Sequence, residues 1–298
     1  MILCIGTLAD QTFCHTVKSL MNDDLHCDIL DIGLLYLSGN IHLSSAAQHH
    51  SFCTSQAEHY FNSYKGIYTR LVDIAGQAST DVLKQRSSGF YQSLRKYLSS
   101  NLRVPVLNPP AGDQSNFTKL YHSVAIASSN NWLMPHSCLT NNEATALEFI
   151  EKHKDVIYKG CSSAKTWARK FVAADAGRLK GLKSSPVLFQ QLINGPDVRI
   201  HIVGEEMFAE KIISSSVDYR TIKGNNYQKI EVPPIIQQGC INLVKETCTP
   251  FLGIDFKIEG KTGDWYFLEA NNMPCYQGYD VRSGYKISGA IKNWFTNN

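Results

Sequence analysis

The sequence predicts a mixed α/β protein built from two or three lobes. Its first 32 residues follow a strand, helix, strand pattern, which implies a parallel sheet with a right-handed crossover. Its last third contains two runs of alternating apolar and polar residues around a Gly-rich turn, which is typical of an antiparallel hairpin. The length of 298 residues, of which 43% are hydrophobic and 18% charged, is sufficient for several hydrophobic cores.

The first lobe is expected to span residues 1–105. Met1–Gly6 and Cys27–Ile32 are its first two strands, and Thr12–Asn22 is the helix between them. Ile67–Ile74 is a third strand, and Thr80–Ser99 is a helix because its apolar residues recur at helical spacing. No Gly-x-Gly-x-x-Gly follows the first strand, so we predict no dinucleotide site in this lobe.

The second lobe is expected to span residues 106–185. It begins where the chain turns at Pro109-Pro110, since consecutive prolines cannot continue a helix or a central strand. A helix is predicted over 116–130, with Lys119 in its first turn. A cation at this end of a helix opposes the helix dipole by about 0.3–1 kcal/mol. Lys119 is therefore either the partner of a nearby anion or a plain surface lysine.

Lys159 ends a predicted strand over 155–159 and leads into a loop of small and polar residues, 160–165, that contains Ser162 and Ser163. The backbone N–H groups of such a loop can fold over a phosphate group. No Gly-Lys-Ser/Thr follows, so the loop is not a P-loop. A flexible connector between two strands explains the composition equally well.

The third lobe is expected to span residues 186–298. Val187–Leu192 and Asp197–Val203 are predicted to pair as a hairpin, and Met207–Ile213 is a further strand. Two prolines at 233 and 234 then introduce an amphipathic helix over 235–248.

Three charged side chains are predicted to gather on one face of these strands. Asp197 and Arg199 are two residues apart and therefore share a face. Lys211, on the next strand, is expected to lie across from them. The polar segment 214–226 follows and contains Asp218-Tyr-Arg220.

The hairpin at the end of the sheet is formed by Phe251–Ile258 and Trp265–Ala270. If it centres on Thr262, Asp255 lies directly opposite Glu269, with Cβ atoms roughly 5 Å apart. Asn271 lies two residues beyond Glu269 and shares its face.

Two carboxylates at that separation repel each other, so a cation is expected between them. At about 4 Å the repulsion costs roughly 1 kcal/mol in water and about 4 kcal/mol at an effective dielectric of 20. Carboxylate and amide oxygens suit a hard divalent ion, Mg²⁺ or Mn²⁺, and so few protein ligands leave positions for water and nucleotide phosphates. The alternative is a solvated hairpin face with unrelated charges.

The composition restricts the class of partner and the compartment. A net charge of +3 without clustered Lys or Arg does not favour nucleic acid. No apolar run approaches the roughly 20 residues of a membrane span, and the first residues do not read as a signal peptide. Nine dispersed cysteines without Cys-x-x-Cys indicate reduced thiols, so we expect a cytoplasmic protein that is not bound to a membrane.

Two other side-chain groups leave alternatives open. Six of the ten histidines precede residue 60, including His49-His50, and they form either a zinc site or ordinary surface and core positions. Cys275, close to the acidic hairpin, is either a nucleophile or a small packing thiol.

Taken together, the two lysines forty residues apart, the strand with Asp-x-Arg, and the final Asp with Glu-x-Asn make the chain resemble the ATP-grasp enzymes. Within that superfamily it is most similar to RimK-type ligases, glutathione synthetase and the graspetide macrocyclases that crosslink ribosomal peptides. The resemblance runs from about Val106 to the end, and the first hundred residues match the βαβ lobe that precedes the ATP-grasp lobes. It implies an ATP-grasp fold in which two α+β lobes clamp a nucleotide.

The resemblance also implies a role for each matching residue. Lysines and serines hold the nucleotide phosphates, the strand around Leu192 lines the adenine, and a carboxylate contacts the ribose. The implied nucleotide-binding residues are Lys119, Lys159, Ser162, Ser163, Gln190, Gln191, Leu192 and Asp197. The implied metal ligands are Asp255, Glu269 and Asn271. Arg199 and Lys211 correspond to cations at the transferred phosphate, and Arg220 to a contact with the substrate carboxylate.

We therefore expect an ATP- and Mg²⁺-dependent (or Mn²⁺-dependent) ligase. It would join a carboxylate to an amine or hydroxyl through an acylphosphate, on a peptide or amino-acid substrate, and a homodimer is left open. The alternatives are an ATP-grasp kinase that stops at phosphorylation and a regulatory protein that binds nucleotide without turnover. A stable phosphorylated product would distinguish the kinase, and absence of ADP formation with a broad panel of substrates would favour the regulator.

Overall fold

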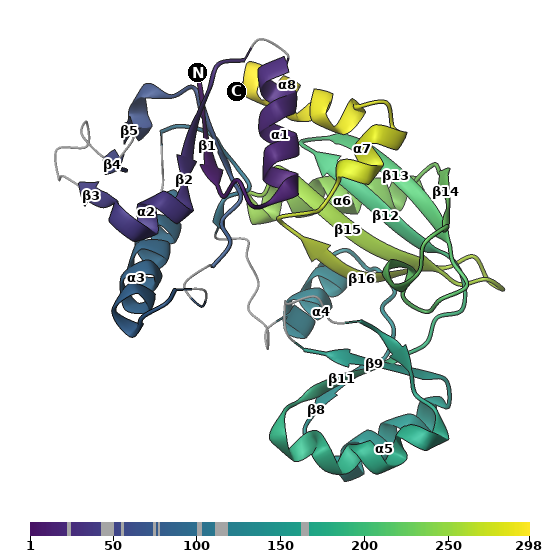
Figure 1. Ribbon diagram of the computed structural model, residues 1–298. Helices are drawn as coiled ribbons and strands as arrows, with labels where there is room; N and C mark the ends of the chain where they lie inside the picture. The colour runs from purple at the N-terminus through teal and green to yellow at the C-terminus, as the bar shows by residue number, and fades with distance from the viewer. Residues whose placement is uncertain are drawn as a thin grey trace.

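The computed structural model contains three lobes, each organised around a sheet (Figure 1). The structure describes residues 1–22, 25–42, 51–54, 57–73, 76, 78–99, 103–110, 119–161 and 167–298. In these ranges no helix has the length and apolar character needed to cross a membrane. All nine cysteines are free thiols.

The first lobe is a parallel sheet with strand order β2-β1-β6-β7. Its strands are β1 (Ile2–Gly6), β2 (Cys27–Asp31), β6 (Gly66–Thr69) and β7 (Val106–Leu107). Its helices are α1 (Gln11–Asn22), α2 (Ile32–Ser38) and α3 (Asp81–Leu98). A small antiparallel sheet is added by β3 (Asn40–His42), β4 (Ser51–Cys53) and β5 (Glu58–Tyr60). The predicted β-α-β start and parallel pairing are confirmed.

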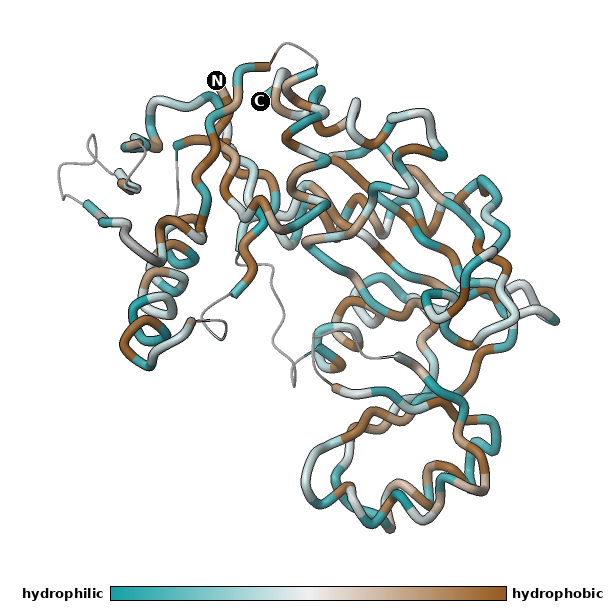
Figure 2. Tube along the Cα trace, in the orientation of Figure 1, coloured by the Kyte–Doolittle hydropathy of each residue, from teal (hydrophilic) through white to brown (hydrophobic). Residues whose placement is uncertain are grey.

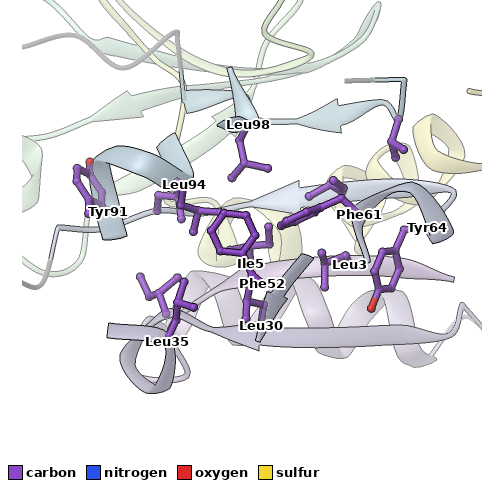
Figure 3. Close-up of a cluster of buried hydrophobic side chains, with 14 of the residues drawn as sticks. Leu3, Ile5, Leu30, Leu35, Phe52, Phe61, Tyr64, Tyr91, Leu94 and Leu98 are labelled. Carbon is purple, nitrogen blue, oxygen red and sulfur yellow. The ribbon is translucent and has the colours of Figure 1, made fainter. Parts of the chain in front are cut away.

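The two faces of this sheet are buried against different partners. One face packs with α2, α3 and the small sheet around Leu3, Ile5, Phe52, Phe61 and Leu94 (Figure 3). The other face packs with α1 and with the C-terminal helix α8 (Lys286–Asn297). The first lobe and the C-terminal end of the chain therefore share one hydrophobic core.

The second lobe contains an antiparallel sheet with order β10-β9-β11-β8. Its strands are β8 (Ser137–Thr140), β9 (Val156–Gly160), β10 (Arg169–Lys170) and β11 (Val187–Gln191). It is covered by α5 (Glu143–His153) and by a 3-10 segment over Ala173–Ser184. Before it, α4 (Lys119–Ser129) lies against an edge strand of the third lobe, at the junction of the lobes (Figure 1).

The third lobe is an antiparallel sheet with order β14-β13-β12-β15-β16. Its strands are β12 (Asp197–Val203), β13 (Glu206–Ile213), β14 (Asn226–Lys229), β15 (Phe251–Ile258) and β16 (Trp265–Asn271). One face is apolar and packs on α6 (Pro234–Thr247). The short helix α7 (Gln277–Arg282) precedes α8. Figure 2 shows hydrophobic stretches along the strands of this sheet and hydrophilic stretches in the outer turns.

One predicted hairpin is wrong. β11 pairs with β8 and β9, whereas β12 pairs with β13 and β15, so the two segments belong to different sheets. The connection is held instead by the last hairpin: the N–H of Gly260 donates to the carbonyl of Asn194 (2.7 Å) and that of Ile258 to the carbonyl of Pro196 (3.0 Å). β7 pairs with β6 in the first sheet, and β11 pairs with β8 and β9 in the second.

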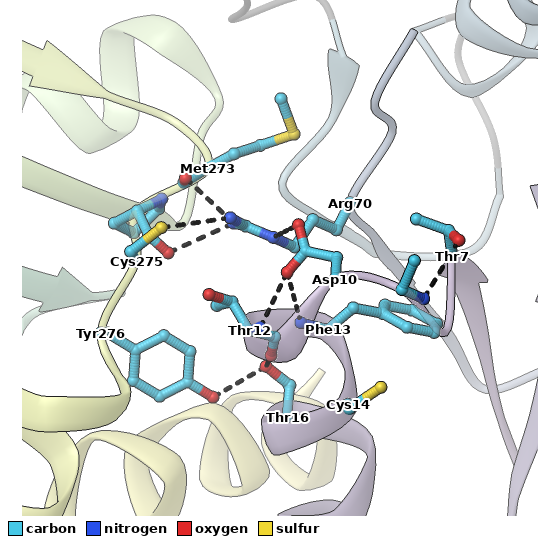
Figure 4. A network of polar contacts seen from close by, with 12 residues as sticks. Thr7, Asp10, Thr12, Phe13, Cys14, Thr16, Arg70, Met273, Cys275 and Tyr276 are labelled. Atoms are coloured by element: carbon cyan, nitrogen blue, oxygen red, sulfur yellow. Dashed lines mark hydrogen bonds and ion pairs between the residues drawn. The ribbon is translucent and has the colours of Figure 1, made fainter. Parts of the chain in front are cut away.

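A buried arginine joins the first lobe to the turn that follows β16 (Figure 4). Arg70 pairs through Nε with Asp10 (2.8 Å), whose other oxygen accepts the first N–H groups of α1. Its Nη1 donates to the carbonyl oxygens of Met273 (2.9 Å) and Pro274 (3.2 Å). Burial alone would raise the pKa of Asp10, but Arg70 lowers it below its ordinary value. The turn after β16 is therefore positioned by a charge from another lobe.

Replacing Arg70 with Met should destabilise the protein by about 3 kcal/mol, because the Asp10 carboxylate would lose its cation in a buried site. The matched control is Arg178→Met: Arg178 is 64% exposed and pairs with Asp175, so its loss should cost less than about 1 kcal/mol. Midpoints of urea denaturation measure both. Equal losses in the two variants would show that Arg70 contributes no more than a surface pair.

Gly195→Ala should also destabilise, by at least about 2 kcal/mol, because Gly195 has a φ of +151° and an added Cβ would lie 2.0 Å from the carbonyl oxygen of Ile258. Gly289→Ala in α8 is the control, since its Cβ would meet no atom within 4 Å and alanine is favoured in helices. The same denaturation measurement applies. A neutral Gly195→Ala variant would mean that the connection between β11 and β12 is not constrained in this way.

Candidate functional site

The predicted pairing of Asp255 with Glu269 is confirmed, but it depends on a β-bulge. From the turn inward, Phe256 pairs with Phe267, yet the next residue, Asp255, pairs with Glu269. Leu268 is therefore an extra residue in β16. Without it, Glu269 would point to the apolar face of the sheet. The bulge brings both carboxylates to the same face.

Asn271 joins the two carboxylates into one cluster. Its Nδ2 lies 3.3 Å from Oδ2 of Asp255 and 3.2 Å from Oε1 of Glu269. The side chains of Asp255 and Glu269 are 19% and 21% exposed, and Asn271 is partly buried. Water therefore screens the charges of the two carboxylates incompletely. Burial raises the pKa of Asp255 above its ordinary value, against the opposing effect of Arg199, and the charge of Glu269 adds to the rise.

Two lysines from different elements meet the Glu269 carboxylate. Nζ of Lys119, at the first residue of α4, lies 2.9 Å from Oε2, and Nζ of Lys159, in β9, lies 4.0 Å from the same oxygen. Burial alone would raise the pKa of Glu269, but the two lysines lower it to about 2. Lys119 is thus the partner of an anion rather than a plain surface lysine, and the two lysines and the predicted metal ligands occupy one site.

Arg199 is the cation that accompanies Asp255. Its Nη1 donates to Oδ2 of Asp255 at 2.6 Å, and its side chain is only 8% exposed. Gly253 makes room for it, because a Cβ there would lie 2.0 Å from Nη2. Next to this pair, Asp197 forms an ion pair with Lys257 at 2.9 Å. Each carboxylate on this face of the sheet therefore has its own cation.

The Asp218-Tyr-Arg220 element lies where the second and third lobes meet. Arg220 donates to both oxygens of Asp218, through Nε at 2.8 Å and Nη2 at 2.6 Å. Asp218 also accepts the N–H of Ala168 (3.1 Å), and the ring of Trp167 lies 5.3 Å from the guanidinium of Arg220. The bonds to Asp218 raise the pKa of Arg220, and Glu269 contributes in the same direction.

Lys211 is not where the sequence predicted. It pairs with Val198, whereas Arg199 pairs with Glu210 and Asp197 with Ile212. Lys211 therefore lies on the opposite face of the sheet from Arg199 and Asp255. The prediction failed because it placed Lys211 across from Asp197 and Arg199 without fixing the register, and a shift of one residue reverses the face.

The strand predicted to line adenine is engaged with its own lobe. Gln190 is buried and donates through Nε2 to Oγ of Ser137 (3.0 Å). The N–H of Leu192 donates to the carbonyl of Asp155 (2.9 Å), so a base contact from this N–H would require that bond to break. Gln191 is half-buried at the end of β11. Ser162 and Ser163 lie outside the described residues.

Three residues of this face were missed by the sequence prediction. Lys257 and His201 follow Asp255 and Arg199 by two residues, so strand alternation alone would have placed them on the same face. Gly253 precedes Asp255 by two residues in the same strand and so lies on the same face. The available signal was the period of two, which was applied to Asp197 with Arg199 and to Glu269 with Asn271 but was not extended to these three residues.

The cluster has the chemistry of a site for a hard divalent cation. It offers two carboxylates and one amide, all with oxygen donors of the kind that Mg²⁺ prefers. Within the described ranges, no group of three or more His, Cys, Asp and Glu side chains is arranged to hold a metal. Asp255, Glu269 and Asn271 therefore fit an ion that is shared with a ligand better than an ion held by protein alone.

No family model and no curated protein matches the chain, but solved structures do. MdnC, a macrocyclase from Microcystis aeruginosa MRC bound with precursor peptide MdnA, has a TM-score of 0.83 at 19% identity, with 100% of both chains covered. A RiPP-associated ATP-grasp ligase from Chryseobacterium gregarium, in complex with ADP and a leader and core peptide, has a TM-score of 0.81 at 17% sequence identity. The match covers 99% of this chain and 96% of that chain. The ATP-grasp ligase PsnB, complexed with a phosphomimetic variant of a minimal precursor, Mg and ADP, has a TM-score of 0.80 at 22% sequence identity. The match covers 99% of this chain and 97% of that chain. The predicted architecture is thereby confirmed over the whole length, and this chain has the ATP-grasp fold.

Proposed function

We propose that this protein is an ATP- and Mg²⁺-dependent ligase that joins a carboxylate to an amine or hydroxyl group on a peptide substrate. The observation that carries the proposal is the convergence of Lys119 and Lys159 on Glu269, beside Asp255 and Asn271. These residues come from a helix at the lobe junction, the second lobe and the third lobe. A site assembled from separate lobes is suited to a ligand that lies between them.

The charges of the site support a polyanionic ligand. Asp255 and Glu269 contribute two negative charges, and Arg199, Lys119 and Lys159 contribute three positive charges. The cations therefore exceed the carboxylates before any metal is added. The surplus favours a nucleotide triphosphate over a neutral or cationic ligand.

The structural neighbours support a nucleotide and a peptide as the two substrates. The PsnB and Chryseobacterium gregarium structures contain ADP, and PsnB also contains Mg. The MdnC and PsnB structures contain a precursor peptide, and the Chryseobacterium gregarium structure contains a leader and core peptide. We extend this substrate class to the present chain, and we propose a cytoplasmic location because its nine cysteines are free thiols.

Each residue would contribute to charge control during phosphoryl transfer. Lys119 and Lys159 would move from Glu269 to the phosphate oxygens and neutralise them. Asp255, Glu269 and Asn271 would hold Mg²⁺, which supplies charge neutralisation at the phosphates when bound. Arg199, fixed by Asp255, would face the transferred phosphoryl group, where a planar guanidinium can bind two oxygens.

The reaction would proceed in two balanced steps. An oxygen of the substrate carboxylate attacks the γ-phosphorus of ATP, and the bond to the β-phosphate oxygen breaks to release ADP. The acceptor amine or hydroxyl then attacks the acyl carbon, inorganic phosphate leaves, and the acceptor loses its proton. Arg220, which is paired in the structure with the carboxylate of Asp218, would bind the substrate carboxylate.

The test is to incubate the purified protein with Mg-ATP and with each short peptide that the sequence of its genomic neighbourhood turns out to encode. We expect ADP and phosphate release that requires the peptide, with a product lighter than the peptide by one water for each bond formed. A stable phosphopeptide would instead identify a kinase. No ADP release with peptides or with a panel of amino acids would favour a regulatory protein.

Glu269→Gln should lower the rate of ADP formation by about 100-fold or more, because it removes one charge from the metal cluster and the counter-charge of both lysines. The fold should be retained, since Gln preserves the shape of the side chain. Glu259→Gln is the control from the same hairpin, where the amide oxygen can still accept the N–H groups of Lys261 and Thr262. A Glu269→Gln enzyme with most of its activity would contradict the assigned site.

A further inference from the structure

The orientation of Arg199 is set by two contacts at opposite ends of its guanidinium group. Nη1 donates to Oδ2 of Asp255 at 2.6 Å, and Nε donates to Nε2 of His201 at 3.3 Å. One carboxylate contact alone would leave the guanidinium free to rotate about that bond. The second contact fixes its plane.

His201 is a buried neighbour of Arg199. It follows Arg199 by two residues in β12, so it lies on the same face of the sheet, and it is 1% exposed. The ring of Tyr279 lies 4.7 Å away, and the rings of Phe251 and Tyr276 lie 6.3 Å and 6.5 Å away. These three rings pack around the imidazole, as expected of a closely packed interior.

Nε2 of the imidazole ring accepts the Nε hydrogen of Arg199, so the hydrogen of the neutral ring lies on Nδ1, and this defines the tautomer. Burial, and then the charges of Arg199 and Arg282, lower the pKa of His201, so the ring is neutral. A protonated ring would have no lone pair for Arg199.

We propose that His201 is a positioning residue that presents the guanidinium of Arg199 to the reacting phosphate by accepting the Nε hydrogen of Arg199. This inference rests on the proposed function, in which Arg199 faces the transferred phosphoryl group. An arginine held in this way needs no reorganisation when the phosphate arrives.

Two variants test the acceptor at the position of Nε2. The amide of Gln reaches the position of Nε2, so His201→Gln keeps an acceptor for Arg199. The shorter Asn reaches only the position of Nδ1, so His201→Asn loses that acceptor. Both remove the aromatic ring, so their losses of packing are matched.

We expect His201→Gln to keep kcat for ADP formation within about threefold, and His201→Asn to lose about 10–100-fold. The KM for ATP should change little in either, because Arg199 acts on the transferred group rather than on binding of the nucleotide. Thermal midpoints of the two variants should agree. Equal losses of kcat in the two variants, or a loss that follows the thermal midpoint, would overturn the inference.

A measurement on the unaltered protein covers the case in which both variants fail to fold. Nitrogen-15 NMR of the His201 ring reports its tautomer, and we expect hydrogen on Nδ1 and none on Nε2. Hydrogen on Nε2, or a charged ring at neutral pH, would overturn the inference. This readout does not depend on ADP formation, so a protein without ligase activity would refute the proposed function while leaving the His201 contact to be decided by the spectrum.

Discussion

The site depends on one constraint: two carboxylates, Asp255 and Glu269, are held directly opposite each other on neighbouring strands. At roughly 5 Å and an effective dielectric of 20, their repulsion is about 3 kcal/mol. Sheet pairing prevents the two strands from moving apart, so cations must offset this cost. Arg199 accompanies Asp255, and Lys119 and Lys159 accompany Glu269. The arrangement is a set of fixed positive groups around a gap that suits phosphate and metal.

The cations come from different parts of the chain, which links the site to the alignment of the lobes. Lys119 starts α4, which lies against the edge strand β16, while Lys159 belongs to the sheet of the second lobe. The first lobe contributes through Arg70, which bonds the turn directly after Asn271. A movement of any lobe therefore changes the position of a charge in the site. Closure around a nucleotide would follow from the same contacts.

Part of this could be predicted from the sequence, because local patterns determine strands, helices and shared faces. The facing pair Asp255 and Glu269 was predicted correctly, but for an incomplete reason. The residue pairs near the turn, such as Ile258 with Trp265, centre the hairpin between residues 261 and 262, and not on Thr262 as predicted. The extra residue Leu268 then shifts the register, so that Asp255 still pairs with Glu269. A bulge has no simple sequence signal.

Other features required the register or the third dimension. Lys211 was assigned to the wrong face because its pairing with Val198 depends on the turn between β12 and β13. The hairpin predicted for 187–203 does not form, because Gly195 and the following Pro196 pass the chain from one sheet to another. The ion pair between Lys119 and Glu269 joins residues 150 positions apart, and the helix dipole argument only indicated that an anion was near.

A crystal of the protein soaked with Mn²⁺ and a non-hydrolysable ATP analogue tests the metal and phosphate site most directly. The anomalous signal of manganese locates the ion without reference to activity. We predict a peak within bonding distance of oxygens of Asp255, Glu269 and Asn271, with the phosphates of the analogue beside it and Nζ of Lys119 and Lys159 turned toward them. A peak elsewhere, or a bound nucleotide whose phosphates lie away from these three side chains, would contradict the account.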